Sequence, residues 1–171
     1  VGQGVEVWER LGNDLTNWQL VGRDTEYGSG PAYGSAFDRR GALYVVSYDG
    51  KLRRYEPGFR GRPLVVDTRS GRRPYSVAVH PSGTRVAVGY EDATAADVYD
   101  SRSLDWLFSA GTRSVNSGDL ASVAWSADGT RLYAGGSYST RSRNPILSWD
   151  RSGEGRMQEL PGPRNTVTHL L

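Results

Sequence analysis

The sequence predicts an all-β protein made of repeated, antiparallel four-stranded units, and three observations lead to this fold class. The phrase "SVAVHPSGTRVAVGY", which begins at residue 76, returns as "SVAWSADGTRLYAGGS" over 122–137. Turn glycines recur at Gly41, Gly83 and Gly129, and alternating apolar residues follow each of them. An aromatic residue followed by an acid recurs independently, as Trp8-Glu9, Tyr55-Glu56, Tyr99-Asp100 and Trp149-Asp150.

The two recurring features keep the same period along the whole chain. The glycines are 42 and 46 residues apart, and each interval holds four short segments with the period-2 alternation of strands. The fourth segments of the successive units are 17–21, 63–67, 105–109 and, more weakly, 156–160. Four strands in such a period are typical of a β-propeller blade, and no segment shows the sustained apolar spacing of a helix. We therefore expect complete blades over about 34–67, 75–109 and 121–160.

The ends of the sequence contain pieces of further blades. Residues 1–21 hold two outer strands, at about 4–8 and 17–21, and "TVTHLL" (166–171) aligns with an inner strand. A ring needs at least about four blades, and an open arc exposes strand edges and blade faces. We therefore expect residues 1–171 to form one propeller segment of a larger ring. Either a longer polypeptide of about seven blades or two copies giving about eight would close it.

Composition excludes several classes of function. The chain has no cysteine, which removes disulfides, thiol catalysis and cysteine zinc sites. Its formal net charge is only +2, which gives no global reason to expect nucleic-acid or membrane binding. No stretch approaches about 18 apolar residues, the length of a membrane span. We expect a cytoplasmic protein that binds neither membrane nor, on balance, nucleic acid.

The repeats resemble WD repeats. In that family the inner strand ends in a phrase like "fSpDG", which "WSADG" (125–129) matches closely, "VHPSG" (79–83) well and "FDRRG" (37–41) loosely. The closing aromatic-acid pairs match at all four positions. The Gly-His pair of the family is missing, and its aspartate six residues before the closing aromatic survives only as Asp49. We therefore expect the family's polar network to be absent, and a lactonase-like or NHL-type propeller remains a neighbouring alternative.

The sequence contains no recognisable catalytic constellation, cofactor motif or metal site. Neither His80 nor His169 has a partner for nucleophilic or metal chemistry, and His80 is interpreted as a turn cap. In the acidic stretch "YEDATAADVYD", Asp97 is placed on the third strand, and Glu91 and Asp92 lie in the turn between the second and third strands, interpreted as a solvated hairpin. The basic stretch from Lys51 to Arg73 allows phosphate or acidic-peptide binding, but the other loops do not repeat it.

Tyrosines provide the candidate binding surface. When the blades are aligned on the turn glycines, Tyr33 and Tyr75 fall together before the inner strand. Tyr48 and Tyr90 fall together after the second strand, with Tyr138 shifted by about two. Both positions face the mouth of the central channel in a WD-type blade, where tyrosines either bind a partner or pack between blades. The expected partner-binding residues are Tyr33, Tyr48, Arg73, Tyr75, Tyr90, Glu91 and Tyr138.

These observations favour a non-catalytic protein-interaction scaffold with a protein or peptide partner. The resemblance implies that such modules serve as recognition ends of larger multidomain proteins, which in bacteria can carry ATPase or protease domains. The alternative is an enzyme propeller, lactonase-like or glycosidase-like, with its active site in the channel. A third hypothesis is an assembly element that completes a ring. The expected core consists of Phe37, Val77, Val79, Val123, Trp125 and the closing aromatics.

Overall fold

A computed structural model describes residues 4–28, 30–113 and 115–170 of the chain. These residues form strands and one short 3₁₀ turn, η1 (Arg151–Gly153), and none of their helical segments has the length and apolar character of a membrane span. The strands are β1 (Val5–Arg10), β2 (Trp18–Asp24), β3 (Ala32–Phe37), β4 (Leu43–Ser47), β5 (Lys51–Glu56), β6 (Arg60–Asp67), β7 (Pro74–Val79), β8 (Arg85–Tyr90), β9 (Ala96–Asp100), β10 (Trp106–Ser109), β11 (Ser122–Trp125), β12 (Leu132–Gly135), β13 (Ile146–Trp149) and β14 (Met157–Leu160).

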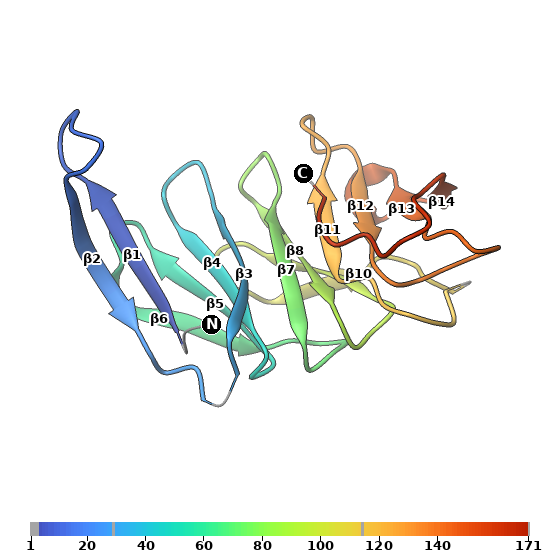
Figure 1. Ribbon diagram of the computed structural model, residues 1–171, viewed down its shortest axis with the longest axis horizontal. Helices are drawn as coiled ribbons and strands as arrows, with labels where there is room; N and C mark the ends of the chain where they lie inside the picture. The colour runs from blue at the N-terminus through green and yellow to red at the C-terminus, as the bar shows by residue number, and fades with distance from the viewer. Residues whose placement is uncertain (1–3, 29, 114, 171) are drawn as a thin grey trace.

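The strands form blades of a β-propeller, as predicted. Three sheets have four antiparallel strands in chain order, β3–β6, β7–β10 and β11–β14, and a two-stranded sheet, β1–β2, precedes them. We number the blades in chain order: β1–β2 is the first blade, β3–β6 the second, β7–β10 the third and β11–β14 the fourth. The inner strand β7 lies between β3 and β11, so the blades stand side by side in an open arc (Figure 1).

The turn glycines lie where the repeat predicts them. Gly41, Gly83 and Gly129 each occupy the turn between the first and second strands of a complete blade. Their φ angles are +86°, +71° and +73°, in the left-handed region that glycine adopts without steric penalty. The recurring phrase is therefore the sequence of a tight turn that joins two β-strands.

The hydrophobic core lies between neighbouring blades. One cluster joins the third and fourth blades, a second joins the second and third, and a smaller one joins the first and second. In the complete blades the closing aromatic also ties down the segment that leads into its own blade. These hydrogen bonds join Tyr55 Oη to Tyr27 Oη (2.8 Å), Tyr99 Oη to the Arg69 N–H (2.8 Å), and Trp149 Nε1 to the Gly111 carbonyl (2.9 Å).

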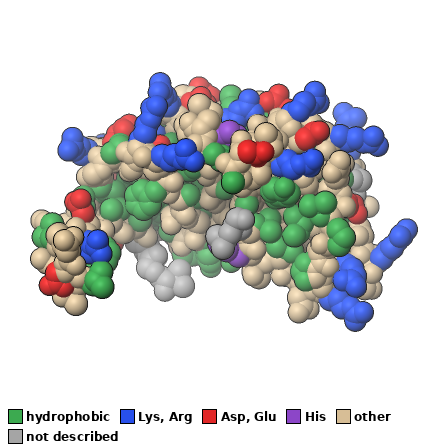
Figure 2. All heavy atoms as spheres, turned by 90° about the horizontal axis from the view of Figure 1, so that it is seen from above, with side chains coloured by type: hydrophobic (Ala, Val, Ile, Leu, Met, Phe, Trp, Pro, Cys, Tyr) green, Lys and Arg blue, Asp and Glu red, His purple; other side chains and the backbone are tan. Residues whose placement is uncertain are grey.

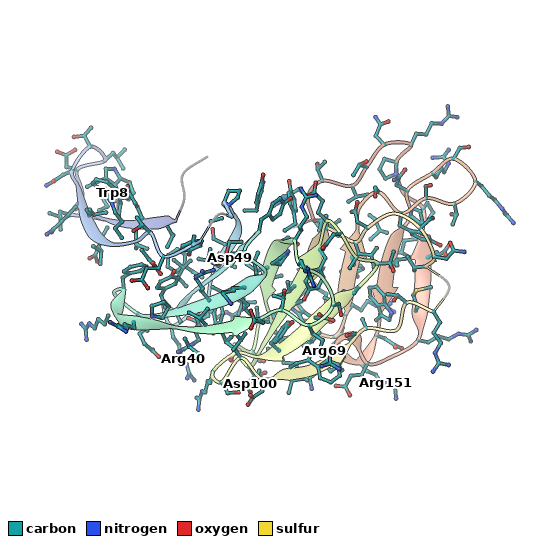
Figure 3. The ribbon with its side chains drawn as sticks, turned by 90° about the horizontal axis from the view of Figure 1, so that it is seen from below. Trp8, Arg40, Asp49, Arg69, Asp100 and Arg151 are labelled. Carbon is teal, nitrogen blue, oxygen red and sulfur yellow. The ribbon has the colours of Figure 1, made fainter. Side chains whose placement is uncertain are left out.

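Part of the expected core is exposed. Val77 and Val123 are buried, and Val79 and Trp125 are partly buried, but Phe37 is 61% exposed and the closing aromatic Trp8 is 49% exposed. Both exceptions follow from the two-stranded first blade, because β1–β2 has no inner strands with which to cover β3. Trp8 lies in the hairpin at one end of the molecule, away from the packed sheets (Figure 3).

The strand expected over 166–171 is not present in its described part, 166–170. These residues do follow the course of a next inner strand: the Val167 N–H donates to the Gly136 carbonyl at 3.0 Å, and the Val167 side chain packs on Gly135. One blade earlier, the backbone of Ala121 lies against the equivalent glycine, Gly89. The segment has no second strand in this sequence with which to form a ladder, so it has the position of an inner strand without the pairing. Leu171 lies outside the described residues.

Candidate interaction surface

Tyr33 and Tyr75 both sit at β-bulges on inner strands. In β3, Ala32 pairs with Ser47 and Gly34 with Val46, so Tyr33 is an extra residue without a partner. The same irregularity falls between Pro74 and Ser76 in β7, which leaves Tyr75 unpaired. A bulge redirects its side chain relative to the pleat. The two rings meet across the junction of the blades, with centroids 5.4 Å apart in a stacked arrangement.

Three further predicted residues join this pair. Tyr48 follows β4 and stacks on Tyr33, with ring centroids 4.1 Å apart. The guanidinium of Arg73, just before β7, lies 4.6 Å from the centroid of the Tyr48 ring and pairs with Glu91 at 3.0 Å. The Tyr48 hydroxyl donates a hydrogen bond to the Glu91 carboxylate. We call these five residues, Tyr33, Tyr48, Arg73, Tyr75 and Glu91, the tyrosine surface.

The charges in the tyrosine surface act on the Tyr48 phenol. Burial raises the pKa of Tyr48 well above its ordinary value, and the hydrogen bond to Glu91 raises it further, because ionisation would place two negative charges together. The neutral phenol therefore remains a donor to Glu91 at physiological pH. The Arg73–Glu91 pair is about half exposed, so its own contribution to stability is small and it acts mainly to orient both side chains.

Asp92, which the sequence analysis assigned to a solvated hairpin, fixes the backbone beside this surface. Its two carboxylate oxygens accept the N–H groups of Arg72, at 2.9 Å, and Arg73, at 3.0 Å. The loop that leads into the third blade is therefore held against the hairpin that leaves β8. The role of Asp92 could have been suspected from its position directly after Glu91. The loop after β8 that carries Asp92 faces the loop before β7 that carries Arg72 and Arg73.

Tyr90, predicted as a surface residue, is instead fully buried. Its hydroxyl donates to Asp97 at 2.6 Å and lies 3.1 Å from the Tyr99 hydroxyl. The misplacement arose because the turn between the first and second strands is one residue longer in the third blade than in the second. The turn of the second blade closes from Asp38 to Ala42, whereas that of the third closes from His80 to Arg85. An alignment of the blades on their turn glycines therefore shifts the second strand by one residue. A shift of one residue in a strand moves every side chain to the opposite face.

Tyr138, the other misplaced tyrosine, is also buried. Its hydroxyl donates to Glu159 at 3.1 Å, and its backbone N–H donates to the Asp119 carbonyl at 3.2 Å. It belongs to the cluster between the third and fourth blades. Tyr138 therefore packs between blades, which was the alternative interpretation for all of these tyrosines.

Two buried polar networks are built on residues in the third strands, Arg53 and Asp97. Arg53 pairs with Asp49 and donates to the Glu26 carbonyl at 2.9 Å, with its guanidinium 3.9 Å from the centre of the Tyr27 ring. Asp97 has the equivalent position one blade later, because Arg53 pairs with Val45 as Asp97 pairs with Val88. Asp97 lies on β9, the third strand of its blade as expected, and is fully buried.

Over the described ranges, no three His, Cys, Asp or Glu side chains are grouped closely enough to hold a metal ion. The His80 ring lies in its turn, with Nδ1 2.7 Å from the Ser82 hydroxyl and Nε2 2.9 Å from the Gly129 carbonyl. Nδ1 thus contacts its own turn, and Nε2 contacts the corresponding turn of the next blade. The face that carries these turns has Lys and Arg side chains along its edges and hydrophobic side chains across its middle (Figure 2).

Comparisons with known proteins bear on the fold. No family model matches this chain, and no curated protein matches its sequence. One chain in a crystal structure of a nidogen/laminin complex superimposes with a TM-score of 0.68 at 12% identity, over 92% of this chain and 58% of that one. A crystal structure of Sqt1 from Chaetomium thermophilum gives 0.72 at 22% identity, over 98% of this chain and 44% of that one. The chain thus spans about half the length of these two structures.

Proposed function

We propose that this chain is a non-catalytic protein-interaction module whose partner is a peptide segment bound across the tyrosine surface, at the mouth of the central channel. The observation that carries the proposal is the row of three stacked rings, Tyr48, Tyr33 and Tyr75, contributed by two neighbouring blades. Tyr33, in the middle of the row, is 46% exposed. Clustered aromatic residues with a nearby arginine supply most of the binding energy at many protein interfaces.

The rigidity of the surface also supports this function. Tyr33 stacks on the Tyr48 ring, Arg73 lies against the same ring, and Glu91 accepts the hydrogen bond of the Tyr48 hydroxyl. Asp92 fixes the backbone on which Arg73 stands. Side chains that are already ordered lose little conformational entropy when a partner binds, so more of the contact energy appears as affinity.

We further propose that the module works within a larger ring, completed by the rest of a longer propeller or by a second copy. Two exposed aromatic side chains support this proposal: Trp8, in the two-stranded first blade, and Phe37, in the inner strand of the second blade. The two matched structures, whose chains are about twice as long, are consistent with it. Sedimentation of the 171-residue chain distinguishes a discrete dimer from a monomer with an open arc.

A peptide selection tests the binding function. Random linear peptides displayed on phage are selected on the 171-residue chain, and their affinities are then measured for Tyr33→Ala and Phe37→Ala. Phe37 is the matched control, because it is an exposed aromatic residue on the same strand but lies at the opposite end of β3. We expect Tyr33→Ala to weaken binding about tenfold or more, with no change for Phe37→Ala.

Two results would contradict the proposal. One is that the selected peptides bind Tyr33→Ala as tightly as the unmodified chain. The other is that Phe37→Ala weakens them equally, which would indicate general adhesion to exposed aromatic rings. Tyr33→Phe, which keeps the stacked ring, is expected to retain binding, and thermal unfolding of each variant shows whether the fold is intact.

A further inference from the structure

A small cavity of about 140 Å³ opens beside the tyrosine surface, at the junction of the third and fourth blades. Tyr75 forms one wall and residues 166–168 form another, and Glu91, Asp119 and Ala121 complete the lining. The cavity is therefore continuous with the proposed peptide-binding surface through Tyr75 and Glu91, which belong to both.

The cavity exists because the repeat changes from one blade to the next. Ala121 occupies the position of Tyr75, since each precedes a serine that pairs with a glycine of the second strand, Gly89 or Gly135. A methyl group at Ala121 thus replaces a phenol ring, and the row of tyrosines ends at Tyr75. By the same alignment Asp119 replaces Arg73, so a carboxylate stands where the previous blade has a guanidinium.

The side chains that line the cavity carry negative charge. The described residues that line it include two carboxylates and no Lys, Arg or His. Among the described residues, the donors to the Asp119 carboxylate are neutral: the Ala121 N–H at 3.2 Å, the Ser137 N–H at 3.1 Å and the Ser137 hydroxyl. Glu91 uses Oε2 for both Tyr48 and Arg73, and the described residues offer no hydrogen bond to its Oε1.

The molecule already shows how a guanidinium binds to this combination of groups. Arg73 lies over the face of Tyr48, 4.6 Å from the ring centroid, while it pairs with the Glu91 carboxylate. The cavity, at the Tyr75 end of the row of tyrosines, offers the same two kinds of group. Tyr75 supplies the ring, and Glu91 and Asp119 supply the carboxylates. Among the described residues, Arg73 pairs with Glu91 from outside the cavity, and no cation lines the cavity itself.

We infer that this cavity binds the guanidinium of an arginine side chain in the partner peptide, an inference that rests on the proposed function. The planar group would stack on Tyr75 and donate hydrogen bonds to Glu91 and Asp119. Arginine suits the cavity better than lysine, because its flat, weakly hydrated head stacks on an aromatic face and carries five donors. The peptide on either side of the arginine would continue onto the tyrosine surface.

Citrulline substitution tests the inference, because citrulline keeps the shape of arginine and removes its charge. Each arginine of the peptides selected above is replaced singly by citrulline, and binding is measured by fluorescence polarisation. We expect one position at which citrulline weakens binding about tenfold. That loss should shrink in Asp119→Asn and Glu91→Gln but persist in Asp128→Asn. Asp128 is the matched control, since it also accepts bonds from its own turn, through Thr130 N–H and Ser126 Oγ, on the opposite face.

A second variant keeps the test decisive if Asp119→Asn does not fold. Ala121→Leu fills the cavity while leaving both carboxylates in place, and it is expected to remove the preference for arginine over citrulline. The inference is overturned if peptides depend on Tyr33 but contain no arginine that citrulline impairs, and the proposed function then stands. It is also overturned if the citrulline effect is unchanged in all three cavity variants. If no selected peptide depends on Tyr33, the proposed function itself fails.

Discussion

Tyr48 and Glu91 occupy the same position in consecutive blades, and the phenol of the first donates a hydrogen bond to the carboxylate of the second. Each directly follows the second strand of its blade, and each backbone N–H donates to the segment before the inner strand, at Pro31 (3.1 Å) and Arg73 (3.0 Å). The repeat thus brings a donor from one blade beside an acceptor from the next. The contact joins the two blades at the proposed binding surface.

The first prediction concerns this hydrogen bond. Tyr48→Phe keeps the ring stacked on Tyr33 and removes the donor, so the free energy of unfolding should fall by about 1 kcal/mol. Chemical denaturation measures the change. Tyr133→Phe serves as a control, because the structure gives the Tyr133 hydroxyl no hydrogen bond to the described residues. Equal losses in the two variants would show that the Tyr48–Glu91 bond contributes nothing specific.

The second prediction concerns the buried carboxylate of Asp97. It accepts hydrogen bonds from the Tyr90 hydroxyl, the Ser70 N–H and hydroxyl, and the Ser109 hydroxyl. Asp97→Ala would remove the shared acceptor of these groups and leave the buried Tyr90 hydroxyl without it, and we expect a loss of about 3 kcal/mol or more in the free energy of unfolding. Asp105→Ala, at an exposed position just before β10, should change stability by less than about 0.5 kcal/mol. A stable Asp97→Ala variant would refute this account of the blade.

The third prediction is instability at alkaline pH. Burial raises the pKa of Tyr27 and of Tyr99 to about 12. An unfolded tyrosine ionises near 10, so the unfolded state loses these protons first, and stability should fall as the pH rises from about 10 towards 12. Phenolate absorbance and far-ultraviolet circular dichroism, recorded together, check this. The interpretation is wrong if all the tyrosines ionise before the sheet signal changes.

The fourth prediction concerns acid. Burial alone would raise the pKa of Asp49, but hydrogen bonds from Arg53 and Ser47 outweigh it and hold this pKa below the ordinary 3.8. A carboxyl with a lowered pKa contributes stability above its unfolded pKa and loses it as the pH falls through the folded value. Asp49→Asn should therefore be less stable than the unmodified chain at pH 7, with the difference narrowing below about pH 4. A difference that stays constant with pH would exclude this origin.

The strand order and the turn positions could be predicted from the sequence because they depend on local chemistry. Period-2 alternation and glycines at tight turns act within a few residues, and two independent repeats mark the same boundaries. Five of the seven predicted binding residues, the tyrosine surface, do lie together. Tyr90 and Tyr138 were misplaced, because one extra residue in a turn reverses the face of the strand that follows.

The polar networks and the cavity could not be predicted in this way. Arg53 and Asp97 differ in charge, yet each occupies the same buried position and holds the segment that leads into its blade. No spacing in the sequence predicts that Asp97 accepts hydrogen bonds from Ser70, or that Asp119 and Glu91 line the same cavity. The role of such groups depends on what the neighbouring blade presents, which is set by packing over long separations in sequence.

The amino-acid sequence alone thus specified blades, their number of strands and the turns between them, since alternation and turn chemistry are properties of neighbouring residues. Which faces are covered, which tyrosines reach the surface and where Ala121 leaves space were decided only when the blades packed against one another. At those places each side chain lies against residues some forty positions away, and its burial, partners and charge environment come from them.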